Sequence, residues 1–150
     1  MRVRPGSWVV AAFVVLTTAC ASSGNAGSAA TIESAYGALS AESAVGQFLD
    51  AAKRNDYQLM SRLFGTRKGP AVEDIGRIEI EQRMYVLASV LAHRSYSLRR
   101  LPVAEADGQM RIAAEMVGTR NGNVIVPFVT SNNNGRWFVE QISTEALSGR

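Results

Sequence analysis

The feature that most constrains the fold of this 150-residue chain is a change in hydrophobic periodicity near residue 95. Between Ala41 and Ala52, apolar residues recur at the i, i+3, i+4, i+7 and i+8 spacing of a single helix face. Ser40, directly before this run, has a hydroxyl that can accept a hydrogen bond from a free N–H of the first turn. The pattern predicts a helix that starts near residue 41 and ends at the polar residue Asn55.

Two further helices are predicted before the change. Asp56 can cap a short second helix, and Gly65 follows it at the position where a helix commonly ends. Its apolar face consists of Tyr57, Met60, Leu63 and Phe64. Residues 65–72, GTRKGPAV, are expected to form a loop. The third helix is predicted over about 74–93, with a stripe formed by Ile80, Met84, Leu87 and Leu91.

After residue 95 the apolar residues alternate with polar ones, which is typical of strands with one buried face. Tyr96 and Leu98 begin this pattern, and Glu115 falls on the solvent side of a later strand, whose apolar face would be Met110, Ile112, Ala114 and Met116. Turns at 121–122 and 132–135 would separate strands over 124–130 and 137–142. Pro127 lies inside a predicted strand, which indicates an edge strand or a bulge.

The predicted fold class is therefore α+β, with three N-terminal helices packed on a curved antiparallel sheet of about four strands. The segment AVGQFLDAAKRNDYQLMSRLFG, residues 44–65, resembles the opening of the nuclear transport factor 2 superfamily. That resemblance covers about 100 residues and implies a cone-shaped fold whose pocket serves isomerisation or cyclisation in some members and binding alone in others. The isomerase members use an acidic base with a tyrosine-and-acid oxyanion hole, and those roles have no residue-by-residue match here.

The first nineteen residues have the order of a secretory signal. Residues 1–7, MRVRPGS, carry two arginines and no acid, and residues 8–16, WVVAAFVVL, are uninterruptedly apolar. This run is far shorter than the roughly 20 residues that span a bilayer. The sequence therefore predicts a signal peptide and not a transmembrane helix.

Cys20 follows this apolar run as the last residue of Leu16-Thr17-Thr18-Ala19-Cys20, which resembles the lipobox of bacterial lipoproteins. The match departs from the family at Thr17, where leucine is preferred. The resemblance implies that the Cys20 thiol is acylated and that the chain is cut before it. An ordinary signal with a chance cysteine is the alternative. Ala21, where an inner-membrane protein of this kind would have Asp, favours the outer membrane over the inner one.

The predicted domains are a signal peptide over 1–19, lipidated Cys20 with a flexible tether over 20–39, and one α+β domain over 40–147. Residues 21–31, ASSGNAGSAAT, have the small, polar composition of a flexible linker. The chain carries 16 basic and 13 acidic residues, and removing the two leader arginines leaves 14 against 13, a net charge of +1. A domain so close to neutral is not expected to bind nucleic acid.

No catalytic or metal-binding constellation is evident in the sequence. With one cysteine and one histidine, the chain can form no intramolecular disulfide and no zinc site of the usual kind, and no cofactor is expected. The candidate pocket residues are four aromatic or titratable side chains: Tyr85, His93, Tyr96 and Trp137. His93 could equally be a favourable cation at a helix C-terminus, and the aromatic residues could be ordinary core residues.

Three functions remain open on this reading. The leading one is a non-enzymatic, lipid-anchored envelope protein whose domain binds a small apolar ligand or a protein partner. The second is an envelope isomerase, cyclase or hydrolase that uses a pocket carboxylate or His93. The third is an assembly module that docks, for example as a homodimer, through its sheet face. A membrane is the one partner that the sequence specifies, through acylated Cys20.

Overall fold

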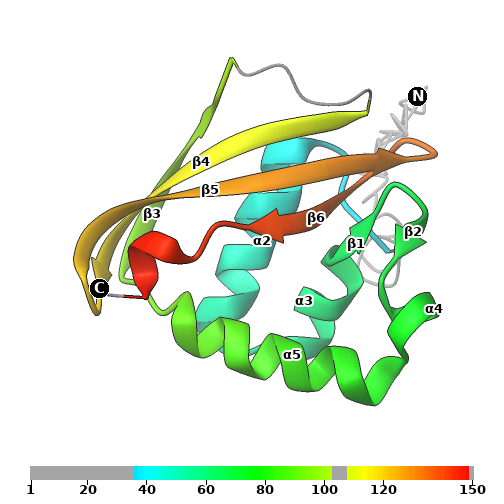
Figure 1. The fold of residues 1–150 in the computed structure, drawn as a ribbon, viewed down its shortest axis with the longest axis horizontal. Coiled ribbons are helices and arrows are strands. Elements are labelled where there is room, and N and C mark those ends of the chain that lie inside the picture. Colours follow the sequence, from blue (N-terminus) through cyan, green and yellow to red (C-terminus); the bar gives the residue numbers. More distant parts are fainter. Residues whose placement is uncertain (1–35, 103–107, 149–150) are drawn as a thin grey trace, which may run out of the picture.

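The computed structural model describes residues 36–102 and 108–148, and within them the fold is α+β. A four-stranded antiparallel sheet in the order β3-β4-β5-β6 curves over the helices, which lie on one of its sides (Figure 1). The helices are α2 (Ala41–Arg54), α3 (Tyr57–Leu63), α4 (Val72–Ile75) and α5 (Arg77–Val90). The signal peptide, Cys20 and most of the tether lie outside the described residues.

Helix α2 forms where the sequence predicts it. The Ser40 hydroxyl accepts a hydrogen bond from the Ser43 N–H at 3.1 Å, and Asn55 ends the helix in the left-handed conformation at φ 57°. The apolar side chains along one face of α2 are almost completely buried: Ala41, Ala44, Val45, Phe48, Leu49 and Ala52. This face is the centre of the core, against which the concave side of the sheet packs.

Helix α3 also begins as predicted, with the Asp56 carboxylate accepting a hydrogen bond from the Leu59 N–H at 3.0 Å. The prediction that Gly65 ends this helix is wrong. The helix ends with Phe64 in an extended conformation, and Gly65 is already in a strand. Glycine is needed there because a Cβ would lie 2.4 Å from the Gly69 carbonyl oxygen and 2.9 Å from the Phe138 ring.

The predicted loop at 65–72 is a small hairpin. Strands β1 (Gly65–Thr66) and β2 (Gly69–Pro70) pair with each other, and Arg67 and Lys68 form the turn between them. We call residues 65–70 the tongue. The Asn133 side-chain amide donates a hydrogen bond to the Arg67 carbonyl oxygen at 2.7 Å, so that the tip is fixed to the end of the sheet.

The predicted helix over 74–93 is broken and shorter. Gly76 has φ 84° and ψ 157°, which interrupts the helical path between α4 and α5. Because glycine adopts this conformation without a steric penalty, a single residue suffices to separate the two helices. Helix α5 ends at Val90, and His93 lies in the connection to the sheet, so its predicted role as a cation in the last helical turn is wrong.

The strands form the predicted meander with longer members. They are β3 (Ser95–Arg100), β4 (Gln109–Thr119), β5 (Gly122–Asn133) and β6 (Arg136–Ile142), followed by the 3-10 helix η1 (Glu145–Leu147). Residues 112, 114 and 116 of β4 are buried on the concave face, and Glu115 is exposed, as predicted. Turns at 120–121 and 134–135 join the last three strands.

Pro127 does not lie on an edge strand, because β5 is central in the sheet. It is tolerated because its backbone faces the end of β6: the Ser143 N–H donates to the Pro127 carbonyl oxygen at 2.9 Å, after β6 has finished at Ile142. The β5–β6 hydrogen-bond ladder therefore ends at Pro127, so the missing N–H of the proline leaves no acceptor in β6 unpaired. The bulge in this pair lies nearby, between Val129 and Thr130.

The folded part of the chain begins before residue 40. Ala38 pairs with Trp137 through two backbone hydrogen bonds of 2.8 Å and is 3% exposed. The Gly37 N–H donates to the Arg62 carbonyl oxygen at 2.9 Å. Residues 37 and 38, predicted as tether, are thus part of the domain.

Candidate functional site

The structure brings two of the four predicted pocket residues together. The rings of His93 and Tyr96 meet edge to face, with centroids 5.5 Å apart. The Tyr96 hydroxyl lies 3.0 Å from both the Gly46 carbonyl oxygen and an Asp50 carboxylate oxygen, and its single proton can be donated to either. Burial, followed by the hydrogen bond to Asp50, raises the pKa of Tyr96 to about 12. Tyr96 therefore holds its proton at neutral pH and ties β3 to α2.

His93 is held in one orientation by its own backbone neighbourhood. Its Nδ1 lies 2.8 Å from the Leu91 carbonyl oxygen, which requires the proton to be on Nδ1. The other ring nitrogen, Nε2, is buried and has no hydrogen-bond partner among the described residues. A general base needs contact with substrate, and this nitrogen faces the interior.

The other two predicted residues lie elsewhere. Tyr85 is 60% exposed on α5 and packs its ring edge to face on Tyr57, at 5.6 Å between centroids. Trp137 is the second residue of β6, the opposite edge strand from β3, which carries Tyr96, and β4 and β5 lie between them. Three strand spacings amount to about 14 Å. The four residues therefore do not line one pocket.

An apolar groove runs along α5, with a volume of about 620 Å³. Its apolar lining comes from Phe64, Met84, Val86 and Leu87. Met84 is fully buried, and the Phe64 ring packs against the buried Phe48 ring at 6.3 Å between centroids, so the base of the groove belongs to the core.

The rim of the α5 groove is polar but carries no unpaired charge. Glu79 and Arg83 line it and form an ion pair with each other at 2.7 Å. Gln82 lies between them in the sequence and offers an amide to the opening. The groove therefore combines an apolar wall with a neutral rim that can give and accept hydrogen bonds, as ligand pockets commonly do.

Helix α5 is apolar beyond its buried stripe. Ile80, Met84 and Leu91 are buried as predicted, whereas Leu87 is half-buried beside the groove. Four more large apolar residues are exposed on the helix: Ile78, Tyr85, Val86 and Val90. The sequence carried one sign of this exposed apolar surface. Helix α5 has apolar residues outside its i, i+3, i+4 stripe, and a helix that only packs on a core does not need them.

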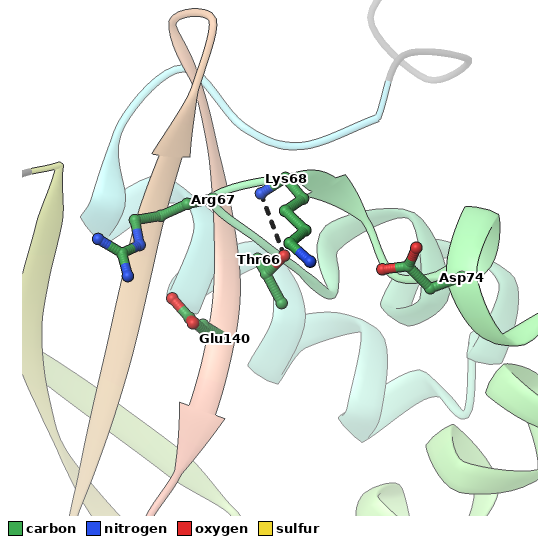
Figure 2. Close-up of a pocket in the computed structure, with 5 residues that line it drawn as sticks. All are labelled: Thr66, Arg67, Lys68, Asp74 and Glu140. Atoms are coloured by element: carbon green, nitrogen blue, oxygen red, sulfur yellow. Dashed lines mark hydrogen bonds between the residues drawn. The ribbon is translucent and has the colours of Figure 1, made fainter.

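A second cavity, of about 560 Å³, lies between the tongue, α4 and β6. It is lined by Thr66, Arg67, Lys68, Asp74 and Glu140 (Figure 2). Figure 2 shows the Arg67 guanidinium extending over the strands towards Glu140, and the Lys68 amine directed towards α4, which carries Asp74. The sequence identified Arg67 and Lys68 as adjacent cations in a loop but gave no sign that two carboxylates would face them.

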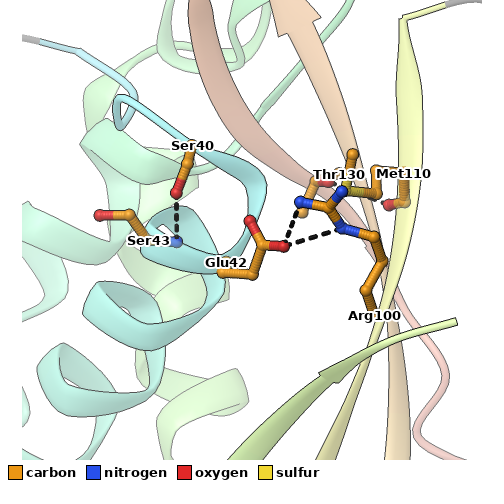
Figure 3. Close-up of polar contacts among 6 residues, drawn as sticks. All are labelled: Ser40, Glu42, Ser43, Arg100, Met110 and Thr130. Atoms are coloured by element: carbon orange, nitrogen blue, oxygen red, sulfur yellow. Dashed lines mark hydrogen bonds and ion pairs between the residues drawn. The ribbon is translucent and has the colours of Figure 1, made fainter.

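A polar contact at the β3 edge of the sheet joins α2 to β3 and has a structural role. The Arg100 Nε donates to the Glu42 carboxylate at 2.9 Å, and on the central strands the hydroxyl of the buried Thr130 donates to the Met110 carbonyl oxygen at 2.9 Å (Figure 3). The pKa of Glu42 lies below its ordinary value of 4.5, chiefly through a hydrogen bond from its own backbone N–H and then through Arg100.

Within residues 36–102 and 108–148, no group of three or more His, Cys, Asp or Glu side chains could hold a metal ion. Over the same ranges no helix combines the length and apolar character that crossing a bilayer requires. No family model, no curated protein and no solved structure matches the chain.

Proposed function

We propose that this chain is a lipid-anchored envelope protein whose domain binds a small, mostly apolar molecule without catalysing a reaction on it. The α5 groove is the observation that carries this proposal. Its base is built from core residues, so the ligand would contact a rigid apolar wall. Its rim charges, Glu79 and Arg83, already neutralise each other, which favours an uncharged ligand with one polar group for Gln82.

We infer that the fold is of the nuclear transport factor 2 type. The curved meander of β3 to β6 covers α2 on its concave side, as the resemblance of residues 44–65 implies. The α5 groove is lined by residues of α5 and by Phe64, which bridges to Val139 of β6.

The groove is tested by titrating the full chain, in a non-ionic detergent below its micelle concentration, with the uncharged dye N-phenyl-1-naphthylamine. The expected result is saturable binding with enhanced fluorescence. Val86→Glu should weaken it by about tenfold or more, because the new carboxylate must lose water when an apolar ligand covers it. Val86 is 59% exposed, so the substitution does not disturb the core.

Val117→Glu is the matched control, because Val117 is also exposed but lies on β4, away from the groove lining. It should leave dye binding unchanged. Equal binding by both variants, or no saturable binding by the unsubstituted chain, would refute the groove as the ligand site. A concentration-dependent dimer that Val117→Glu dissociates would instead support the assembly role, which uses the sheet face.

The anchor is a separate part of the proposal. Acylation of Cys20 would bury one methylene after another in lipid, at about 0.8 kcal/mol each, and two chains hold a protein stably where one does not. We expect Cys20→Ser to release the protein from membranes or to stall its processing in a bacterial host. Labelled palmitate should enter the unsubstituted chain and not the variant, and its absence from both would contradict the anchor.

A further inference from the structure

We propose that the cavity under the tongue is a second binding site, selective for zwitterions that carry a phosphate or carboxylate close to a primary ammonium group. This inference does not depend on the α5 groove. It rests on the five residues that line the cavity, which come from the tongue, α4 and β6.

The cationic half of this site is held by the fold. The Asn133 amide fixes the carbonyl of Arg67, and the Lys68 N–H donates to the Thr66 hydroxyl at 3.1 Å. Gly65 brings the two tongue strands and the Phe138 ring so close together that no larger residue fits. The backbone that carries the two adjacent cations is thus tied to the sheet.

The anionic half is also positioned. Glu140 lies beside the irregularity in the β5–β6 pairing, where Val129 pairs with Gln141 and Thr130 with Val139, so that Glu140 has no partner of its own on β5. Bulges of this kind redirect a side chain, and they are common next to binding sites. The Gln109 amide donates to one Glu140 oxygen at 2.8 Å and leaves the other oxygen available. Asp74 adds a second carboxylate from α4.

Opposite charges line the same cavity and yet do not pair. In the part of the chain that the structure describes, no ion pair joins Arg67 or Lys68 to Glu140 or Asp74, although each cation points towards one of these carboxylates (Figure 2). A gap therefore separates the opposite charges of this cavity. A ligand with both charges would bridge it, since its anion fits the guanidinium in a bidentate manner and its ammonium can donate to Glu140.

The primary ammonium is the specific part of the inference. A carboxylate with one free oxygen recognises N–H donors, which a quaternary ammonium lacks. A cavity of about 560 Å³ is within the usual size range of small-molecule sites. Two sources offer this chemistry: the phosphoethanolamine headgroup of a membrane lipid, and free amino acids or short peptides.

The test is isothermal titration of the full chain, in a non-ionic detergent, with O-phosphoethanolamine. The proposal expects saturable binding that is about tenfold tighter than that of phosphocholine or of inorganic phosphate. Comparable binding of phosphate alone would overturn the zwitterion site in favour of a simple anion site. Absence of any binding would overturn the site altogether.

Variants assign the two halves. Arg67→Ala with Lys68→Ala should abolish measurable binding, whereas Glu140→Gln, which keeps an acceptor for Gln109, should erase the preference for phosphoethanolamine over phosphocholine. Arg120→Ala is the matched control on an exposed turn at 120–121, and it should bind as the unsubstituted chain does. Retained preference in Glu140→Gln would refute the role of the carboxylate. All four substitutions are at positions whose side chains are outside the apolar core, and circular dichroism verifies the fold.

Competition then identifies the source. Vesicles containing phosphatidylethanolamine should displace the soluble probe if the ligand is a headgroup, and L-alanyl-L-alanine should displace it if the ligand is a free zwitterion. Either displacement supports the site, and displacement by phosphatidylcholine vesicles to the same extent contradicts it. Val86→Glu should leave all these titrations unchanged, so a failure of the α5 groove and a failure of this site give different results.

Discussion

Replacing Gly65 by alanine should destabilise the domain and loosen the tongue at once. The added Cβ would lie 2.4 Å from the Gly69 carbonyl oxygen, 2.9 Å from the Phe138 ring and 3.0 Å from the Pro70 Cα. Two of these three neighbours are backbone atoms, so a side-chain rotation cannot relieve the contact. The two tongue strands must move apart.

The expected loss of stability follows from the cost of overpacking. Forcing an extra methyl group into a close-packed site costs about 1–3 kcal/mol. In a domain of this size each kcal/mol corresponds to about 4–8 °C in melting temperature. Gly65→Ala should therefore lower the melting temperature by about 4 °C at the least. It should also weaken binding of phosphoethanolamine, because Arg67 moves with the tongue.

The matched control is Gly46→Ala. A Cβ at this position in α2 would lie 3.4 Å from the Tyr96 hydroxyl and 3.6 Å from Leu98, which is ordinary contact. Alanine is favoured over glycine inside a helix by about 0.5–1 kcal/mol. Urea unfolding of the full chain, followed by circular dichroism, should show Gly65→Ala less stable and Gly46→Ala equal or more stable. Equal stability of Gly65→Ala and the unsubstituted chain would refute the steric reasoning.

Two further predictions concern ionisable groups. The pKa of Glu42 is lower in the folded chain, chiefly through the hydrogen bond from its own backbone N–H and then through Arg100, so its ionised form stabilises the fold above pH 4.5 and does so less as the pH falls below it. Glu42→Gln should cost about 0.3–1 kcal/mol at pH 7, because the side chains of Arg100 and Glu42 are 60% and 37% exposed and solvent screens the pair, and the difference should vanish in urea titrations near pH 3. Tyr96, with a pKa raised to about 12, contributes stability that is complete below pH 10 and is lost as the pH rises towards 12. Absorbance at 295 nm should show a tyrosine that ionises near pH 12, and Tyr96→Phe should remove that step.

The helical first half could be predicted because its signals are local. Ser40 and Asp56 each cap the helix that follows them, and the face of α2 is read from the spacing of its apolar residues. The meander was predictable for the same reason, since the alternation in β4 and the turn at 120–121 are properties of short segments.

The tongue and the break at Gly76 depend on contacts far apart in the sequence. Asn133 fixes the tip of the tongue from 66 residues away in the sequence, and the segment GTRKGP contains no signal that predicts this hydrogen bond. A lone glycine in a helical pattern also has two readings, tolerated or broken, which only the surrounding packing decides. The same limit applied to Pro127, whose acceptability depends on where a neighbouring strand stops.

The candidate pocket residues were chosen by type, and type alone does not place them. His93 and Tyr96 are three residues apart in the sequence and come together, whereas Trp137 lies on the opposite edge of the sheet and Tyr85 on the exposed side of α5. Two residues that line the α5 groove, Met84 and Leu87, were predicted as part of the buried stripe of the helix. A half-buried position such as Leu87 cannot be told from a fully buried one by periodicity.

The most direct test of the proposed function is to locate the bound apolar ligand by NMR of the methyl-labelled full chain. Titration with N-phenyl-1-naphthylamine should shift the methyl signals of Met84, Val86 and Leu87, and leave those of Val117 and Ile125 in place. Shifts confined to Val117 and Ile125 would place binding on the sheet and contradict the account. Shifts centred on Leu98, beside His93 and Tyr96, would contradict it too and would favour the enzyme.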